Sequence, residues 1–489
     1  MAKLKLQGKD LRKINYPEDR TIAIVIDVMH KHFKHYTLEC ALILLKEILD
    51  NPFEFSENEP LSKIAQALID YNMKCLIKGE TDKMTIATEL LQDRLEQPAR
   101  HFAFRSDTLD YASFGMNHIE EGALKQMETA MKLPVTAAGA LMPDAHQGYG
   151  LPIGGVLATE NAVIPYGVGV DIGCRMSLSV FAVSEKMLKS KQAYFEKILK
   201  ENTLFGAGKE FVKSADHAIL DRVEFNEIPM LKSLQLKAAK QLGSSGSGNH
   251  FVEFGIVEIT DAANNMHLPI GKYLGLLSHS GSRGLGATVA NHYTKLAMER
   301  CKLPQESRHL AWLSLDTQEG LEYWQAMNLS GDYASACHHT IHYKIAKELN
   351  ENAISVIENH HNFAWKEVHN GKQVIVHRKG ATPAGKNVMG IIPGSMTAPG
   401  YIVSGKGNEA SLHSASHGAG RKMSRSKAQS SISMSEMKKL LSENGVTLIG
   451  GGLDEAPQAY KDIQKVMQAQ TDLVQVEGLF YPKIVRMDG

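Results

Sequence analysis

Short apolar runs separated by glycine-rich turns dominate the chain after Arg100, and this pattern limits the possible folds more than any other feature. The stretch LPIGGVLATENAVIPYGVGVDIGCRMSLSVF, residues 151–181, contains several such runs. Apolar runs of this length between glycines are typical of β-strands in sheets. Helical patterns follow at 184–243 and 288–358, the longest being LAWLSLDTQEGLEYWQAMNLSGDYASACHHTIHYKIAKEL. The sequence therefore predicts an α+β (mixed α/β) fold with much antiparallel sheet and surrounding helices.

The first 98 residues have a different pattern. Apolar side chains recur at helical spacing at Leu38, Ala41, Leu45 and Ile48, and the run stops at Asn51-Pro52. Similar patterns at 61–76 and 84–95 predict two more helices. We expect a small helical appendage at 1–98 without a catalytic cluster. Residues 99–489 carry no repeat or low-complexity linker, which favours one large catalytic domain.

Composition excludes several classes of function. The 54 basic and 54 acidic side chains balance to a formal charge of +0, so any polyanion must be held by a local patch. Five scattered cysteines and no secretory signal favour the reducing cytoplasm. Apolar runs are broken by charge before they reach the length of a membrane span. The 21 histidines favour metal binding or proton transfer.

Several of these histidines follow or lie within predicted strands, near a cysteine and a carboxylate. GVGVDIGC places Asp171 and Cys174 three residues apart, although a cysteine beside glycine is more often a small buried hydrophobe. In GSGNHFVEF, strand alternation puts His250 and Val252 on one face and Asn249, Phe251 and Glu253 on the other. A core histidine bonded to the backbone is an equally good interpretation of His250 alone.

Two further motifs add imidazoles. HSGSRGLG supplies His279 and a phosphate-binding candidate, Arg283, and ENHHNFA supplies His360 and His361. We expect one of the two adjacent histidines to face inward and the other to be solvated. A set of one thiol, one carboxylate and three imidazoles suits a borderline divalent ion such as manganese or zinc. The predicted ligands are Asp171, Cys174, His250, His279 and His361.

The stretch SASHGAGRKMSR places His417 before three small residues and several basic ones. Small residues let backbone N–H groups approach an anion, and a helix beginning just after Gly420 would favour phosphate there. Arg421, Lys422 and Arg425 support the same interpretation. The alternative is a surface loop whose histidine only caps a helix. The chain lacks a Walker loop, a dinucleotide-binding glycine motif and a G-x-S-x-G elbow.

Nine motifs follow one another between about Arg100 and the C-terminus: MPDAHQGYGLPIGG, GVGVDIGC, GSGNHFVEF, HSGSRGLG, HHNFA, HRKGATPA, IIPGSM, SHGAGRKMSR and DEAPQAYKD. Taken in this order, they resemble the motifs of the RtcB family of RNA ligases. The appendage resembles one found on some bacterial members.

The resemblance implies GTP- and manganese-dependent joining of RNA 3′-phosphate or 2′,3′-cyclic phosphate ends to 5′-hydroxyl ends. His417 matches the family's guanylylated histidine, and Cys174 matches a ligand shared by two manganese ions. By the same likeness, Asp171 and His250 hold one ion and His279 and His361 the other.

Residues matching the guanylate site are Asp144, Asn249, Glu253, Asn362, Ser395, Gly418, Ala419, Gly420, Arg421 and Tyr460. Those matching RNA-phosphate contacts are Arg283, Lys379 and Arg425.

Three positions depart from the family pattern. Asp488 stands where a penultimate lysine is usual, and a carboxylate there would repel a nucleotide unless Arg486 or Lys483 compensated. Pro399-Gly400 replaces a usual serine contact, and Arg175 replaces a usual glycine.

These departures keep two alternatives open: a manganese-dependent phosphoesterase or cyclic phosphodiesterase, and a non-catalytic RNA-end binding subunit. We expect RNA and GTP as partners in the leading interpretation, and no membrane.

Overall fold

The computed structural model describes residues 4–56, 58–78 and 99–489. The chain divides into two compact units, Met1–Ala99 and Arg100–Gly489, which are described separately here. The predicted helix at 84–95 lies outside the described residues. Within the described ranges, no helix is both long and apolar enough to cross a membrane.

The N-terminal unit is helical. Its helices are α1 (Gly8–Arg12), α2 (Arg20–His32), α3 (Leu38–Asp50), the 3₁₀ turn η1 (Pro52–Phe55) and α4 (Ser62–Lys78). The helix predicted at Leu38 is confirmed, and the Thr37 hydroxyl caps it by accepting the Cys40 N–H. Leu45 and Ile48 from its apolar face are fully buried against Val25 of α2. Hydrophobic packing therefore accounts for the periodicity in this unit.

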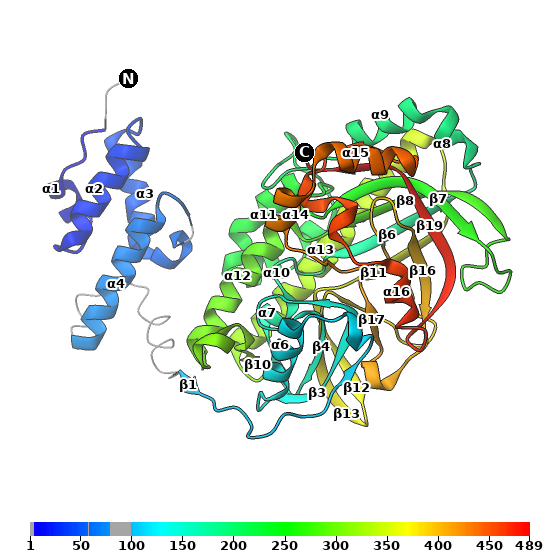
Figure 1. Cartoon of the computed structure of the whole chain (residues 1–489). Helices are drawn as coiled ribbons and strands as arrows, with labels where there is room; N and C mark the ends of the chain where they lie inside the picture. The colour runs from blue at the N-terminus through cyan, green and yellow to red at the C-terminus, as the bar shows by residue number, and fades with distance from the viewer. Residues whose placement is uncertain (1–3, 57, 79–98) are drawn as a thin grey trace. The chain divides into compact units, whose positions relative to one another are not determined.

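The larger unit contains two main sheets that are mostly antiparallel, as predicted (Figure 1). One sheet has the strand order β11-β6-β8-β7-β19-β16-β15, with β18 paired to β19. These strands are β6 (Arg175–Phe181), β7 (Phe251–Ile259), β8 (Gly271–Ser280), β11 (Ala353–His360), β15 (Met389–Ile392), β16 (Gly400–Gly405), β18 (Thr447–Ile449) and β19 (Val474–Met487).

The other sheet has the order β12-β13-β4-β3-β2. Its strands are β2 (Ala112–Ser113), β3 (Thr136–His146), β4 (Ile153–Thr159), β12 (Phe363–His369) and β13 (Lys372–Lys379). Three short pairs complete the strands: β1 (Arg100–His101) with β9 (Cys301–Lys302), β5 (Ala162–Val163) with β10 (Leu313–Ser314), and β14 (Ala381–Pro383) with β17 (Ser414–Ser416).

Helices surround the sheets. The α-helices are α6 (Glu121–Met131), α7 (Pro165–Val168), α8 (Lys186–Ser190), α9 (Gln192–Asn202), α10 (Glu224–Glu227), α11 (Pro229–Gln241), α12 (Arg283–Arg300), α13 (Gln318–Leu349), α14 (Arg425–Ser431), α15 (Met434–Glu443) and α16 (Ile463–Gln468). The 3₁₀ helices are η3 (Met116–His118), η4 (Ala218–Asp221), η5 (Gln305–Leu310), η6 (Glu409–Ser411), η7 (Leu453–Glu455) and η8 (Pro457–Ala459).

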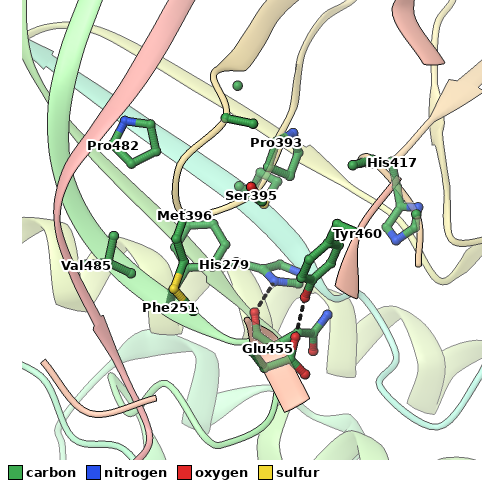
Figure 2. A pocket seen from close by; sticks show the side chains of 18 of the residues that line it. Phe251, His279, Pro393, Ser395, Met396, His417, Glu455, Tyr460, Pro482 and Val485 are labelled. Carbon is green, nitrogen blue, oxygen red and sulfur yellow. Dashed lines mark hydrogen bonds between the residues drawn. The ribbon is translucent and has the colours of Figure 1, made fainter. Parts of the chain in front are cut away.

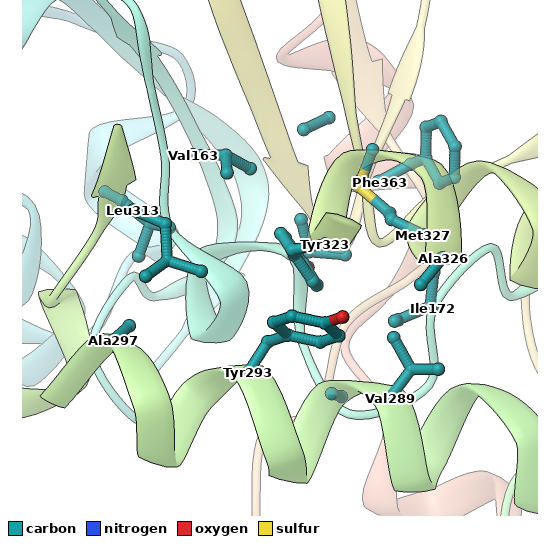
Figure 3. Close-up of a cluster of buried hydrophobic side chains, with 14 of the residues drawn as sticks. Val163, Ile172, Val289, Tyr293, Ala297, Leu313, Tyr323, Ala326, Met327 and Phe363 are labelled. Carbon is teal, nitrogen blue, oxygen red and sulfur yellow. The ribbon is translucent and has the colours of Figure 1, made fainter. Parts of the chain in front are cut away.

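The largest apolar core lies between α12, α13 and the neighbouring strands (Figure 3). Tyr293 of α12 and Tyr323 of α13 are buried, with ring centroids 5.3 Å apart. Gly331 of α13 lies against the loop that precedes β6. A Cβ on Gly173 of that loop would come within 2.7 Å of the Gly331 Cα. This close approach fixes the loop that carries Cys174.

Two predicted helical regions proved less helical than expected. Within 288–358, α12 ends at Arg300 and α13 begins only at Gln318, with Leu313–Ser314 forming a strand between them. The Thr317 hydroxyl accepts the Gly320 N–H and so sets this start. Within 184–243, residues 203–217 form no helix. Gly206 and Gly208 have φ values of 122° and 69°, which an α-helix does not accommodate, and Phe205 forms an isolated bridge with Gly246.

Candidate active site

A cluster of thiol, carboxylate and imidazole groups lies where the chain enters β6 and crosses from β11 to β12. Cys174 Sγ lies 3.4 Å from His250 Nε2 and 3.2 Å from His279 Nε2. His279 Nε2 is also 3.2 Å from His361 Nε2. Asp171 Oδ2 lies 2.9 Å from His250 Nε2. The structure thus brings together all five residues that the sequence singled out for a metal.

Backbone contacts orient His279 as a ligand. Its Nδ1 lies 3.0 Å from the Asn249 carbonyl oxygen. Because a carbonyl can only accept, the hydrogen bond places the ring proton on Nδ1. Burial lowers the pKa of His279 to about 3, so the ring is neutral and its Nε2 lone pair is free. That lone pair faces the thiol and His361, whose pKa burial also lowers. One thiol and several imidazole nitrogens gathered at one point are a set of ligand atoms that fits a borderline divalent cation.

The other side of the cluster is arranged differently. Arg283 Nη2 donates to His250 Nδ1 over 3.1 Å, which leaves the ring proton on Nε2, directed at Asp171. Ligation through His250 Nε2 therefore requires Arg283 to release Nδ1. Burial and the neighbouring Asp171 raise the pKa of the Cys174 thiol, and a bound cation would act in the opposite direction.

His417 lies directly after β17 and next to this cluster. Its ring centroid is 4.9 Å from that of His361. Its Nδ1 lies 2.7 Å from Oδ2 of Asp144, a fully buried carboxylate from β3. The ring donates Nδ1–H to this carboxylate, so Nε2 keeps a lone pair. An imidazole held in this way is a competent nucleophile.

The backbone after His417 is not a helix start as predicted. The helix α14 begins at Arg425, where the Ser424 hydroxyl accepts the Lys427 N–H. Gly420 has φ +73°, and a Cβ there would come within 2.3 Å of the Asp144 carbonyl oxygen. This close packing against β3 requires glycine. The small residues therefore hold the loop against the strand that carries Asp144.

A cavity of about 270 Å³ opens beside His417 (Figure 2). Figure 2 shows His417 and Tyr460 towards one side and Pro482 and Val485 of β19 towards the other. Many of the predicted guanylate-site residues line it: Asn249, Glu253, Ser395, Gly418, Ala419, Gly420, Arg421 and Tyr460. Asp144 contacts the back of His417 instead, and Asn362 accepts the Gly380 N–H through Oδ1.

The predicted alternation along β7 is confirmed at three of its residues. Phe251 and Glu253 face the cavity, whereas Val252 packs into a core on the other face. Burial raises the pKa of Glu253 well above its usual range. A buried carboxyl at this position is suited to pair with the N–H groups of a ligand.

Glu455 is a cavity residue that sequence reasoning missed. Arg421 Nη1 lies 3.1 Å from its Oε2, and Arg425 Nη2 lies 3.2 Å from its Oε1. The Tyr460 hydroxyl donates to the same carboxylate, as the dashed line in Figure 2 marks. Arg421 also lies over the Tyr460 ring, 5.3 Å from its centroid. The position of Glu455 in the DEAPQAYKD motif, five residues before Tyr460, is the sequence feature that could have identified it.

The chain is similar to known proteins over most of its length. A family model described as "tRNA-splicing ligase RtcB" matches residues 126–486. The chain belongs to the RtcB family. "RNA-splicing ligase RtcB1" of Escherichia coli strain ATCC 25922 is 32% identical over 393 residues, covering 73% of this chain and 92% of the relative. "tRNA-splicing ligase RtcB" of Nanoarchaeum equitans is 31% identical over 424 residues, covering 72% and 88%.

The three basic residues predicted to hold RNA phosphates occupy separate positions in this RtcB-family chain. Arg283 contacts His250, and Arg425 pairs with Glu455 at the cavity. Lys379 is buried and donates to the Tyr149 carbonyl. Burial lowers the pKa of Lys379 to about 7. Arg283 and Arg425 thus lie at the site, while Lys379 is held by the Tyr149 carbonyl and lies over the Tyr166 ring.

The departures from the RtcB pattern have structural settings. Arg175 points away from the thiol: it donates to the Gly331 carbonyl and pairs with Glu358 at 2.8 Å. Met487 lines the cavity, but Asp488 is not among its lining residues. The Asp488 carbonyl accepts the Gly451 N–H. Gly400 begins β16 and lines the cavity without a side chain.

The expectation for the paired histidines holds in part. His361 faces inward, is buried and enters the cluster. His360 is half-buried and packs against Phe363 and Trp365, with ring centroids 5.0 Å away in each case. Burial lowers the pKa of His360 to about 3.

Proposed function

We propose that this chain is an RNA ligase that joins 3′-phosphate or 2′,3′-cyclic phosphate ends to 5′-hydroxyl ends, using GTP and manganese. Membership of the RtcB family supports RNA ligation. The observation that carries the finer proposal is the position of His417, whose ring lies between the Asp144 carboxylate, the thiol–imidazole cluster and the cavity.

In the first step, His417 Nε2 attacks the α-phosphorus of GTP. A nitrogen–phosphorus bond forms, the bond to the bridging oxygen breaks, and pyrophosphate leaves with the electron pair. Asp144 stabilises the positive charge that develops on the ring and keeps Nδ1 protonated. The buried position of Asp144 strengthens this interaction because water does not screen it.

Manganese would be held by Asp171, Cys174, His250, His279 and His361, where it supplies positive charge to the reacting phosphates. The residues of the chain do the rest of the positioning. The Asn249 carbonyl holds the His279 proton on Nδ1, and Arg283 can turn from His250 towards an incoming phosphate.

The cavity is suited to the guanosine part of the nucleotide. An ionised Glu253 accepts from the N1–H and N2–H groups of guanine, a pair of donors that adenine lacks. Glu455 fixes the Tyr460 hydroxyl, so the tyrosine ring is held as a wall for the base. Arg421 and Arg425, both paired with Glu455 at the cavity wall, would offer positive charge to the phosphates.

Two transfers complete ligation. An oxygen of the RNA 3′-phosphate attacks the guanylate phosphorus, and the bond to His417 breaks with its electron pair returning to Nε2. The 5′-hydroxyl oxygen then attacks the RNA phosphorus and forms the phosphodiester. The phosphorus–oxygen bond to GMP breaks, GMP leaves with the electron pair, and the hydroxyl proton passes to solvent. A cyclic phosphate must first be opened by water. The cytoplasmic location suggested by the scattered cysteines is part of this proposal.

A ligation assay tests the proposal. One RNA with a 3′-phosphate and another with a 5′-hydroxyl are incubated with protein, GTP and manganese, and the product is sized on a denaturing gel. We expect joining that requires GTP, and no joining of a 3′-hydroxyl to a 5′-phosphate. Removal of the 3′-phosphate without joining would instead favour the phosphoesterase. Binding without either reaction would favour the RNA-end binding subunit.

A further inference from the structure

A second cluster of histidine and glutamate side chains lies away from the cysteine and its imidazoles. It joins the tip of the β12–β13 hairpin to η6 and the residue before β17. Three possible ligand atoms, one each from Glu367, His369 and His413, all lie within 4.8 Å of one another. The His369 and His413 ring centroids are 4.8 Å apart, and Glu409 Oε1 lies 2.9 Å from His413 Nε2.

The contacts of His369 point to a ligand. Its Nε2 lies 2.9 Å from Glu367 Oε2, to which it donates its proton. The side chain is only 4% exposed, and Nδ1 is buried without a hydrogen-bond partner. Glu409 Oε2 lies 3.6 Å from this nitrogen. A lone pair facing a carboxylate needs either a proton or a cation between them.

We propose that this cluster binds a transition-metal ion of the zinc type, with His369 Nδ1, His413 and Glu409 as ligands. Ligands about 2.0–2.1 Å from a tetrahedral ion lie about 3.3 Å from one another. The two Glu409 oxygens lie at separations that bracket this value: Oε1 is 2.9 Å from His413 Nε2, and Oε2 is 3.6 Å from His369 Nδ1. Glu367 orients His369 in the manner of carboxylates behind zinc-bound histidines.

The protein holds both sides of this site in place. Arg378 is 1% exposed and donates to both oxygens of Glu367, at 2.6 and 3.0 Å. The same guanidinium donates to the Leu412 carbonyl and to the Ser414 hydroxyl. Leu412 and His413 have φ values of 52° and 50°. Residues other than glycine rarely adopt such values, so the surrounding contacts must hold the backbone in this conformation.

The site has a structural consequence for catalysis. The loop that carries His413 continues into β17, and His417 follows that strand. An ion shared by His369 and His413 would pin the hairpin tip to the segment that delivers the nucleophile. The inference needs only the geometry of these four side chains and is independent of the proposed ligase chemistry.

Metal content tests the inference. The full chain is dialysed against Zn²⁺ and then against metal-free buffer, and zinc per chain is measured by mass spectrometry. The comparison uses the wild type, His413→Ala and Glu409→Gln, each also in a Cys174→Ala background that perturbs the other cluster. Glu409 is 69% exposed, so its substitution leaves folding intact.

His339→Ala is the matched control, because His339 is an exposed imidazole 3.6 Å from Glu358. We expect His413→Ala to lose about one zinc per chain in both backgrounds. Glu409→Gln should weaken zinc affinity by roughly 10–100-fold or more. Loss of a residue that only hydrogen-bonds a metal ligand already has an effect of that size, and Glu409 is proposed to be a ligand itself. His339→Ala should lose none. Equal zinc in the wild type and both site variants, or an equal loss in His339→Ala, would overturn the proposal.

Discussion

The thiol–imidazole cluster and the Glu455 network lie on two sides of the same site, yet their polar groups are paired in opposite ways. Around Glu455, two arginines and a tyrosine hydroxyl share one carboxylate. In the cluster, the lone pair of His279 faces another imidazole and a thiol. Buried ion pairs and hydrogen bonds of the first kind build architecture, whereas a thiol and several imidazole nitrogens gathered at one point offer the ligand atoms of a metal site.

Removing the Cys174 thiol, which contacts both His250 and His279, tests this comparison most strongly. Cys174→Ala should abolish the cation site and lower ligation by about 10³-fold or more, since a metal supplies several kcal/mol of charge stabilisation. Manganese content and ligation rate are the measurements. Cys337→Ala, which removes another buried cysteine, is the matched control and should retain both. Equal losses in the two variants would contradict the assignment.

Asp144→Asn tests the residue behind the nucleophile. An amide at this position no longer offers a negative charge to Nδ1–H, so we expect guanylate transfer to slow by about 10²-fold. The KM for GTP should change little, because Asp144 contacts His417 and not the cavity. A raised KM with unchanged kcat would show that Asp144 binds nucleotide instead.

Glu253 gives the pH dependence. Burial raises its pKa, so the carboxyl keeps its proton to a higher pH than an ordinary glutamate. Only the ionised form accepts both guanine N–H groups, and GTP should therefore bind more tightly as the pH rises through this pKa. Glu253→Gln should weaken binding by about 10-fold and remove the dependence. Calorimetric titration across pH measures both effects; an unchanged pH profile in Glu253→Gln would exclude this role.

Glu455→Gln should change the chemistry least and stability more. Losing the charge that Arg421 and Arg425 share should lower the free energy of unfolding by about 2 kcal/mol. The loss is no larger because both arginines keep some contact with water, which screens the interaction. Urea denaturation measures this loss. Glu443→Gln, from an exposed pair with Lys439, should cost about 0.5 kcal/mol or less. Similar losses in both variants would remove the structural distinction drawn for Glu455.

The sequence predicted the members of the site better than their surroundings. Asp171, Cys174 and His279 are brought together as expected, because ordered motifs carry ligand identity even across long separations. The helix expected after Gly420 begins instead at Arg425, since the Ser424 cap decides the start and Gly420 packs on β3.

Other features depended on tertiary contacts that no local pattern records. The role of Glu455 becomes clear only when Arg421 and Tyr460 are placed beside it. The position of Asp488 outside the cavity lining likewise follows from the path of β19 and its contact with Gly451. Local periodicity also misplaced the start of α13, which a threonine cap determines.

Transfer of label from GTP tests the central claim, that His417 is the nucleophile. The protein and His417→Ala are incubated with α-labelled GTP and manganese, denatured and separated on a gel. We predict acid-labile label on the wild type, because a phosphoramidate bond hydrolyses in acid, and none on His417→Ala. An unlabelled wild type, or equal label on His417→Ala, would contradict the account.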